Sequence, residues 1–227
     1  MVVESLIVKK ADKILLDLSF SVGDSLALVG QSGSGKSLTL KALLGMLPST
    51  LVSDLRLRSE FELLRGKSVA FVPQNPFNAL SPLTKIRDQF FSSRLEELFA
   101  LVDLDASLAD RYPSELSGGQ LQRVVIAMAL SIDPMLMLLD EPTTALDPDS
   151  KRVVLDLLTR LRDRVGFKMI FVSHDLDSAM SVCEDVCVLK GGVIVERGRL
   201  KEVASSPKEA YTKLLIESNF ATRGFRE

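Results

Sequence analysis

The sequence has 227 residues, of which 46% are hydrophobic and 26% are charged, and its formal net charge is −2. This size and composition are typical of a folded protein with one large domain or two small ones. The near-neutral balance, without a block of one sign, argues against nucleic acid or anionic lipid as a general partner.

The apolar runs are too short to cross a membrane. The longest, residues 124–130 and 135–139, fall well below the roughly 18 residues that a bilayer span requires. The first ten residues lack the basic start and apolar stretch of a signal peptide. We therefore expect the chain to stay in the cytosol and not to cross a membrane by itself.

The first third of the chain is predicted to form strands around a Gly/Ser loop, followed by a helix that stops at Pro48. The predicted elements are strands over 14–20 and 25–29, a loop over 30–37, a helix over 38–47, a half-exposed antiparallel strand over 55–63 and a buried strand over 69–72.

The middle of the chain has a different character. Asn-Pro and Ser-Pro turn signals precede helical spacing over residues 86–102. We expect a helical subdomain over about 76–132, inserted in a single domain that covers 1–227.

The last third alternates helices and strands again. The predicted elements are a helix over 120–132, a buried strand over 135–140, an amphipathic helix over 150–165, a buried strand over 168–173, a hairpin of 185–190 and 193–197, and a helix over 207–218. This alternation predicts an α/β fold with a mainly parallel core sheet and a small antiparallel part.

The Gly/Ser loop carries a phosphate-binding motif. Its sequence fits G-x-x-x-x-G-K-[ST] in full, with a predicted strand before it and a helix after it. Backbone N–H groups of such a loop point at phosphate oxygens, a lysine reaches the β- and γ-phosphates, and a hydroxyl ligates Mg²⁺. The residues predicted to bind ATP are Gly30, Gln31, Ser32, Gly33, Ser34, Gly35, Lys36, Ser37 and Leu38, with Lys36 also catalytic and Ser37 also a Mg²⁺ ligand.

Two consecutive carboxylates end the apolar strand that is predicted over 135–140. A carboxylate at such a strand end can hold hydrated Mg²⁺, and the next one can orient and activate a water molecule. We therefore assign Asp140 to the metal and Glu141 to the attacking water.

A Ser-Gly-Gly turn before a predicted helix forms a second candidate anion site. The motif Leu116-Ser117-Gly118-Gly119-Gln120 resembles the signature sequence of the ABC ATPases. In that family, the signature of one subunit closes on the ATP that the other subunit holds. The resemblance implies that Ser117, Gly118, Gly119 and Gln120 contact ATP across a dimer.

Three further motifs follow the order of the ABC family. Gln74 stands where the family has its Q-loop glutamine, which touches Mg²⁺ and the transmembrane partner. Ala145-Leu146-Asp147 is similar to the D-loop, which implies that Asp147 communicates across the dimer. A lone histidine is usually structural, but Ser173-His174-Asp175 resembles the switch region, whose histidine contacts the γ-phosphate. The resemblance covers essentially the whole chain.

The finer resemblance is to the oligopeptide/dipeptide/nickel importer group. The segments that carry it are Pro73-Gln74-Asn75-Pro76, Leu80-Ser81-Pro82 (where the group usually has Asn for Ser81), residues 116–124, residues 140–147 and Tyr211-Thr212-Lys213-Leu214-Leu215. Residues 34–39 favour the nickel members. Some members carry a C-terminal extension with cysteines for an iron–sulfur cluster, and we expect no cluster here.

The sequence departs from the family where the adenine base is held. The family usually places an aromatic ring well before the phosphate loop, to stack on adenine. That position corresponds to Lys10 or a neighbour, and no aromatic residue lies between Met1 and Leu18. Either an aliphatic side-chain stem holds the adenine or a partner supplies the contacts, and we therefore predict weaker discrimination between nucleotide bases.

The resemblance implies an ATPase that works in pairs at the cytoplasmic face of the membrane. Each subunit binds ATP and Mg²⁺, and dimer closure brings the partner's signature onto the γ-phosphate, while Glu141 and His174 position water. Closure and reopening drive separate transmembrane permease subunits, with a substrate-binding protein in the full complex. A heterodimer is expected, although symmetry allows a homodimer.

Two other classes of ABC protein are alternatives. A non-transport ABC ATPase of chromosome maintenance or DNA repair carries a long coiled coil between phosphate loop and signature, and that interval is short here. A regulatory subunit binds ATP with little turnover, whereas Glu141 and His174 are both present. The sequence names neither the transported substrate nor the partner ATPase.

Cys183 and Cys187 are the two cysteines. Their spacing could place both on one helix face, as half of a metal site. Two buried, reduced thiols are the simpler expectation.

Overall fold

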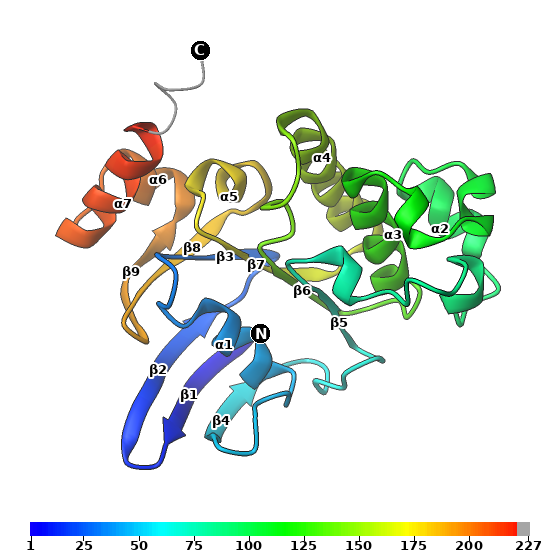
Figure 1. The fold of residues 1–227 in the computed structure, drawn as a ribbon. Coiled ribbons are helices and arrows are strands. Elements are labelled where there is room, and N and C mark those ends of the chain that lie inside the picture. Colours follow the sequence, from blue (N-terminus) through cyan, green and yellow to red (C-terminus); the bar gives the residue numbers. More distant parts are fainter. Residues whose placement is uncertain (222–227) are drawn as a thin grey trace. The chain divides into compact units, whose positions relative to one another are not determined.

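Strands and helices alternate along most of the chain in the computed structural model, which describes residues 1–221 and the side chains of residues 1–218 (Figure 1). The chain divides into two compact units, Met1–Leu63 with Lys168–Glu227, and Leu64–Phe167. The predicted α/β class is confirmed.

The first unit is built on a sheet in which parallel and antiparallel pairs are separated. Its strands are β1 (Val2–Lys10), β2 (Lys13–Ser21), β3 (Ser25–Val29), β4 (Val52–Arg58), β7 (Lys168–Ser173), β8 (Asp185–Lys190) and β9 (Val193–Arg199), in the order β4-β1-β2-β9-β8-β3-β7. β3 pairs in parallel with β7 and β8, and β2 with β9. β1 pairs antiparallel with β2 and β4, and β8 with β9.

Burial follows from these pairings. Every residue of β3 is buried, as expected for a parallel strand covered on both faces. β2 instead alternates, with Leu16, Leu18 and Phe20 buried and Asp17 and Ser19 exposed, so one of its faces meets the core.

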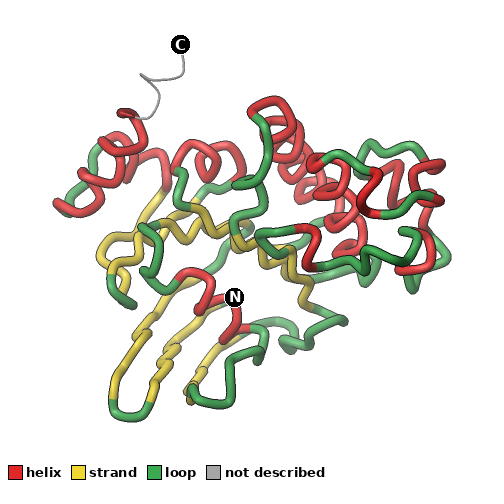
Figure 2. The backbone as a smooth tube through the Cα atoms, in the orientation of Figure 1, coloured by secondary structure: helices red, strands yellow, loops and turns green. Residues whose placement is uncertain are grey.

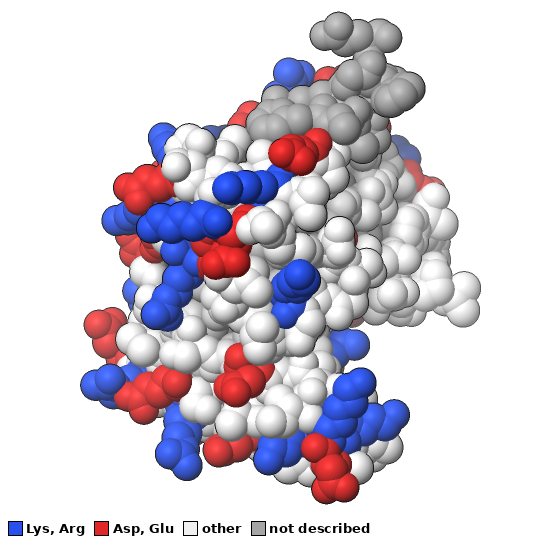
Figure 3. Space-filling view, turned by 90° about the vertical axis from the view of Figure 1, so that its left-hand side faces the viewer, with Lys and Arg blue, Asp and Glu red and all other residues white. Residues whose placement is uncertain are grey.

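Short helices complete the first unit. They are α1 (Lys36–Leu43), α5 (Leu176–Val182), α6 (Leu200–Ser205) and α7 (Ala210–Ala221). α5 packs on β3 and β7, while α6 packs on β8 and β9. One face of the molecule carries Lys and Arg interspersed with Asp and Glu (Figure 3).

The second unit is mainly helical. Its parallel strands are β5 (Val69–Val72) and β6 (Leu136–Asp140), and its α-helices are α2 (Leu95–Leu101), α3 (Gly118–Leu130) and α4 (Pro148–Val165). α3 packs against α2, α4 and β5. The stretch between β5 and β6 consists of helix, turn and loop, with short 3-10 turns at Pro76–Asn78, Arg87–Gln89, Ala106–Asp110 and Pro113–Glu115 (Figure 2).

Several predicted boundaries were wrong. The strand predicted over 55–63 is β4, which ends at Arg58 because Arg58 pairs with Val2, the first residue of β1. The helix predicted over 38–47 begins at Lys36 and ends at Leu43, shortly before Gly45, which turns the chain at φ 63°. The smaller shifts at α3, α4 and α7 affect helix ends, which fray.

The helical spacing of residues 86–102 does not correspond to one continuous helix. The structure breaks it into the turn Arg87–Gln89 and helix α2. Phe90 is extended between them, and its ring packs edge-to-face on Phe99 with centroids 5.7 Å apart. The extended residue interrupts the helical spacing, so one continuous helix does not form.

Three elements were not predicted at all. β1 was not predicted because a register shift between Val3 and Leu6 interrupts the alternation of buried and exposed residues. Its buried residues Val3, Leu6 and Val8 are therefore unevenly spaced. α5 and α6 are short helices with few turns to produce a periodic pattern. Cys183 caps α5 and Cys187 lies in β8, so they do not share a helix face, and both are buried.

Candidate functional site

The phosphate loop and the histidine leave the same edge of the sheet in the first unit. β3 and β7 run parallel, and Val29, the last residue of β3, pairs with Ser173, the last residue of β7. After β3 the chain enters the phosphate loop at Gly30. After β7 it reaches His174, which is exposed and directly follows Ser173. The carboxyl ends of parallel strands are where α/β sheets bind their ligands.

Two loop glycines are required by close approaches. A Cβ at Gly30, where φ is +157°, would lie 2.3 Å from the backbone oxygen of Leu189. A Cβ at Gly35, where φ is +109°, would lie 2.4 Å from Leu16 Cδ2. Positive φ and the absence of a side chain let the loop turn tightly into α1.

Lys36 begins α1 and is folded onto the loop. Its Nζ donates to the carbonyl oxygen of Gly30 at 2.7 Å and to that of Gln31 at 3.1 Å, and the residue is only 5% exposed. Burying an ammonium group requires such partners. The side chain is therefore held beside the loop's amides, where a phosphate would meet it.

The loop also contains a polar atom that needs a partner. The Ser34 hydroxyl is buried and makes no hydrogen bond to the protein. A buried hydroxyl without a partner is costly, and a phosphate oxygen is an acceptor that would satisfy it. The Ser34 hydroxyl, the Lys36 ammonium and the glycine-rich backbone together offer the hydrogen-bond donors that a phosphate group requires.

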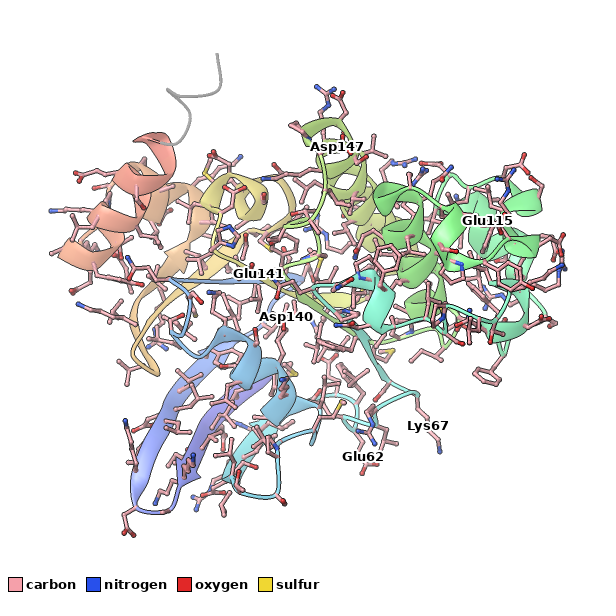
Figure 4. All side chains as sticks on the ribbon, viewed as in Figure 1. Glu62, Lys67, Glu115, Asp140, Glu141 and Asp147 are labelled. Carbon is pink, nitrogen blue, oxygen red and sulfur yellow. The ribbon has the colours of Figure 1, made fainter. Side chains whose placement is uncertain are left out.

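In the second unit, the candidate site residues also lie at the carboxyl ends of two parallel strands. β5 and β6 run parallel with Val72 opposite Leu139, so Gln74 and Asp140 both follow at one strand edge. Asp140 ends β6 and is buried, and Glu141 comes next (Figure 4).

Glu141 is held in an uncommon backbone conformation. Its φ is +47°, in the left-handed region that non-glycine residues seldom adopt. The Thr144 hydroxyl donates to Glu141 Oε2 at 3.0 Å, and the Thr144 amide donates to the Glu141 carbonyl at 3.2 Å. Thr144 thus orients the carboxylate that the sequence assigns to water activation, a contact that the sequence analysis missed.

The signature residues form the start of α3. Ser117 is the N-cap, its Oγ accepts from the Gln120 amide at 3.2 Å, and Gln120 Oε1 accepts from the Ser117 amide at 2.9 Å. This capping box satisfies two amides at the helix start. The Ser117 hydroxyl keeps its own proton for donation.

The signature lies directly against the first turn of α4. A Cβ at Gly119 would lie 2.8 Å from Ser150 Oγ and 3.0 Å from Ser150 Cβ, and one at Gly118 would lie 3.5 Å from Leu146 Cδ2. Asp147 caps α4 and accepts from the Asp149 and Ser150 amides at 3.1 and 2.9 Å (Figure 4). Hydrogen bonds from the Ser150 side chain and amide hold the pKa of Asp147 below its usual range.

The donor types suit Mg²⁺. Ser37, Gln74 and Asp140 supply a hydroxyl, an amide oxygen and a carboxylate, and Mg²⁺ prefers oxygen ligands. In the part of the chain that the structure describes, no group of three or more His, Cys, Asp and Glu side chains could hold a metal ion. Mg²⁺ sites of nucleotide enzymes rely on one or two protein ligands plus phosphates, and so need no such cage.

Some residues that act on the predicted ones were not assigned a role from the sequence. Ser150 lies in no motif named above, and Thr144 lies in the 140–147 segment that resembles the importer group but was given no role of its own. Tyr211 was noted only as part of a family resemblance, yet its hydroxyl accepts from the Gln31 amide at 3.0 Å. Predicting that contact would have required the fold, because 180 positions separate the two residues.

These two units carry the parts of a phosphate-loop nucleotide-binding protein. The family model described as ABC transporter matches residues 15–144. The chain belongs to the ABC transporter family, as one of its ATP-binding subunits, in which ATP hydrolysis is coupled to transport. ABC ATPase subunits dimerise and act with transmembrane subunits.

The chain is similar to curated ATP-binding proteins of peptide transport. The oligopeptide transport ATP-binding protein OppD of Lactococcus lactis subsp. cremoris is 34% identical over 232 residues, covering 90% of this chain and 69% of its own. A putative peptide import ATP-binding protein of Brucella ovis is 37% identical over 237 residues, covering 89% of this chain and 70% of its own.

Solved structures confirm the ABC ATPase fold. CbiO1 from Clostridium perfringens, part of the ABC transporter complex cbiONQ, matches with a TM-score of 0.75 at 26% identity, covering 90% of each chain. A dimeric ATP-binding cassette in a post-hydrolysis state with ADP and Pi matches with a TM-score of 0.71 at 26% identity, covering 88% of this chain and 99% of that one. Over the described residues, no helix has the length and apolar character needed to cross a membrane.

Proposed function

We propose that this chain is the ATP-hydrolysing subunit of an importer of the peptide/nickel group, bound at the cytoplasmic face of the membrane. The two relatives named above serve oligopeptide and peptide transport, and this favours a peptide over nickel as the cargo. The observation that carries the ATP-binding part is the glycine loop with a buried lysine and a buried, unpartnered Ser34 hydroxyl.

Mg·ATP binds on the phosphate loop. Backbone amides of the phosphate loop and the Lys36 ammonium contact the phosphates, because a glycine-rich loop before a helix presents N–H groups to anions. Ser37, Asp140 and Gln74 hold the Mg²⁺, which neutralises phosphate charge when bound.

Hydrolysis uses Glu141 and His174. The Glu141 carboxylate accepts a proton from the attacking water, and the hydrogen bond from Thr144 orients it. His174 contacts the γ-phosphate. Phosphoryl transfer of this kind depends mainly on positioning and charge stabilisation.

A second ATPase subunit completes each site. Ser117, Gly118, Gly119 and Gln120 of one subunit contact the nucleotide held by the other, and Asp147 lies beside them at the start of α4. Heterodimers are favoured because the importer group often pairs two different ATPases, and a homodimer is the alternative.

This chain exposes apolar residues after the Q-loop glutamine that a permease subunit would contact. Phe77, Leu83 and Phe91 follow Gln74 in the chain and are exposed, with Leu83 and Phe91 almost fully so. Exposed aromatic and aliphatic side chains gathered on one segment favour a protein partner over solvent. A substrate-binding protein supplies the cargo to the permease.

Uptake measurements test the proposal. In cells lacking this chain, uptake of short peptides should fall, and the wild-type gene should restore it while a gene encoding Glu141→Gln should not. Loss of nickel uptake alone would make the chain the motor of a metal importer. Unchanged uptake of both would contradict the importer assignment, and phosphate release by the purified chain would then separate a non-transport ATPase from a regulatory subunit.

A further inference from the structure

The C-terminal helix of the described chain touches the phosphate loop. Tyr211, in the first turn of α7, accepts a hydrogen bond from the Gln31 amide at 3.0 Å. Gln31 is the second residue of the phosphate loop. The nucleotide site described above assigns no role to this tyrosine.

The hydroxyl of Tyr211 and the ammonium of Lys36 hold one peptide group from its two sides. The carbonyl oxygen of Gly30 and the amide of Gln31 belong to the same planar peptide unit. Lys36 Nζ donates to that carbonyl at 2.7 Å, and the Tyr211 hydroxyl accepts from that amide at 3.0 Å. Hydrogen bonds on both sides of a peptide group polarise each other, so each strengthens the other.

Without these bonds the peptide would be free to reorient. Glycine populates a wide range of backbone angles, and Gly30 precedes the amide in question. A change in its orientation would move the carbonyl that anchors Lys36 Nζ. The Tyr211 hydroxyl therefore influences the position of the Lys36 ammonium when a phosphate binds.

Tyr211 is itself well fixed. The Lys190 ammonium, at the end of β8, lies 5.0 Å from the centroid of the tyrosine ring. The carboxylate of Glu196 on β9 accepts from the Lys208 and Glu209 amides at 2.9 and 3.1 Å, just before α7 begins.

The β8–β9 hairpin also contacts the phosphate loop directly. The Gly192 amide, in the turn between β8 and β9, donates to the carbonyl of Ser34 at 3.0 Å.

The β8–β9 hairpin thus supports the loop in two ways, through Gly192 directly and through α7 with its tyrosine. We propose that Tyr211 is a positioning residue of the nucleotide site, which orients the Gly30–Gln31 peptide and through it the Lys36 ammonium. The inference rests on the proposed binding of ATP to this loop.

Removal of the hydroxyl alone tests the role. Tyr211→Phe keeps the ring beneath Lys190 and deletes only the acceptor. The dissociation constant for Mg·ATP should rise about fivefold, the effect of one neutral hydrogen bond. In steady-state hydrolysis, KM for ATP should rise similarly while kcat changes less than about twofold, because the lost contact already exists before the reaction.

A matched control makes the same chemical change elsewhere. Tyr112 is the chain's other tyrosine and is exposed, so Tyr112→Phe should leave the dissociation constant unchanged. Lys36→Ala tests the site itself and should weaken Mg·ATP binding strongly. Thermal unfolding of each full-length variant shows how much of it is folded.

Each outcome decides between the alternatives. Weaker binding by Tyr211→Phe with an unchanged Tm supports the positioning role. Wild-type affinity in Tyr211→Phe, or a loss that only follows a lowered Tm, overturns it while leaving the site intact. Equal affinity of wild type and Lys36→Ala would instead reject the proposed nucleotide site, and this inference with it.

Discussion

Replacing Gly119 with alanine would place a methyl group against the first turn of α4. The new Cβ would lie 2.8 Å from Ser150 Oγ and 3.0 Å from Ser150 Cβ. The hydroxyl could rotate away, but Ser150 Cβ is fixed to the helix backbone. The two helix starts, which carry the signature and Asp147, must therefore separate by a few tenths of an ångström.

The net cost follows from two opposing effects. Overpacking of this kind costs about 1–3 kcal/mol. Replacing glycine with alanine inside a helix returns about 0.5–1 kcal/mol, because the unfolded chain loses freedom. Gly119→Ala should therefore destabilise the protein by about 1 kcal/mol, within a range of about 0–2.5 kcal/mol, and about 1 kcal/mol lowers the Tm of a chain of this size by about 2–4 °C.

The adjacent glycine supplies the matched control. A Cβ at Gly118 would meet Leu146 Cδ2 at 3.5 Å, an ordinary contact, so Gly118→Ala should be neutral or slightly stabilising. Ser150→Gly removes both close atoms and should relieve most of the Gly119→Ala defect when the two are combined. The coupling energy between the two changes should reach about 1 kcal/mol in chemical unfolding.

Two results would refute this reasoning. One is equal destabilisation by Gly118→Ala and Gly119→Ala, which would mean that the helix start, and not its contact with Ser150, resists a side chain. The other is additivity of Gly119→Ala and Ser150→Gly, which would show that the two positions do not touch in solution.

Three other expectations concern chemistry and pH. Glu141→Gln should bind Mg·ATP, accumulate a dimer visible by size-exclusion chromatography and release phosphate at least about 100-fold more slowly; wild-type turnover would refute the assignment of the base. No aromatic residue lies between Met1 and Leu18, where the family resemblance places an adenine-stacking ring at Lys10 or a neighbour, so ATP, GTP and CTP should bind with comparable affinity; strong selectivity for ATP in competition titrations would contradict this. Burial alone would raise the pKa of Glu196, but hydrogen bonds that include those from the Lys208 and Glu209 amides outweigh it and hold that pKa below the usual range of a glutamate. The stability that the Glu196 carboxylate contributes is therefore present at neutral pH and is lost as the pH falls through the lowered pKa, so Glu196→Gln should cost stability at neutral pH and progressively less in acid.

Local patterns predicted the elements whose surroundings are uniform. β3, β6 and β7 are buried along nearly their whole length, so each appears as a continuous apolar run. α4 carries an amphipathic stripe over many turns. Where tertiary contacts interrupt the pattern, as at the register shift of β1 or at Phe90, the same reasoning failed.

The motifs were readable because each one is short and contiguous. A glycine-rich loop that must wrap phosphate, or a serine that must cap a helix, needs particular residue types at fixed local spacing. Residues 30–37 and 116–120 could therefore be assigned without any fold. The role of Thr144 could not, since a threonine three positions after a glutamate fits many turns and only the structure shows the hydrogen bond between their side chains.

The sequence by itself determined the family, the nucleotide motifs and the order of the main elements. Only the tertiary structure decided that Val29 pairs with Ser173 and that Gly119 packs on Ser150. It alone brought Tyr211 to Gln31. Strand register and side-chain packing are set by the simultaneous burial of distant segments, and that information is absent from any single window of the chain.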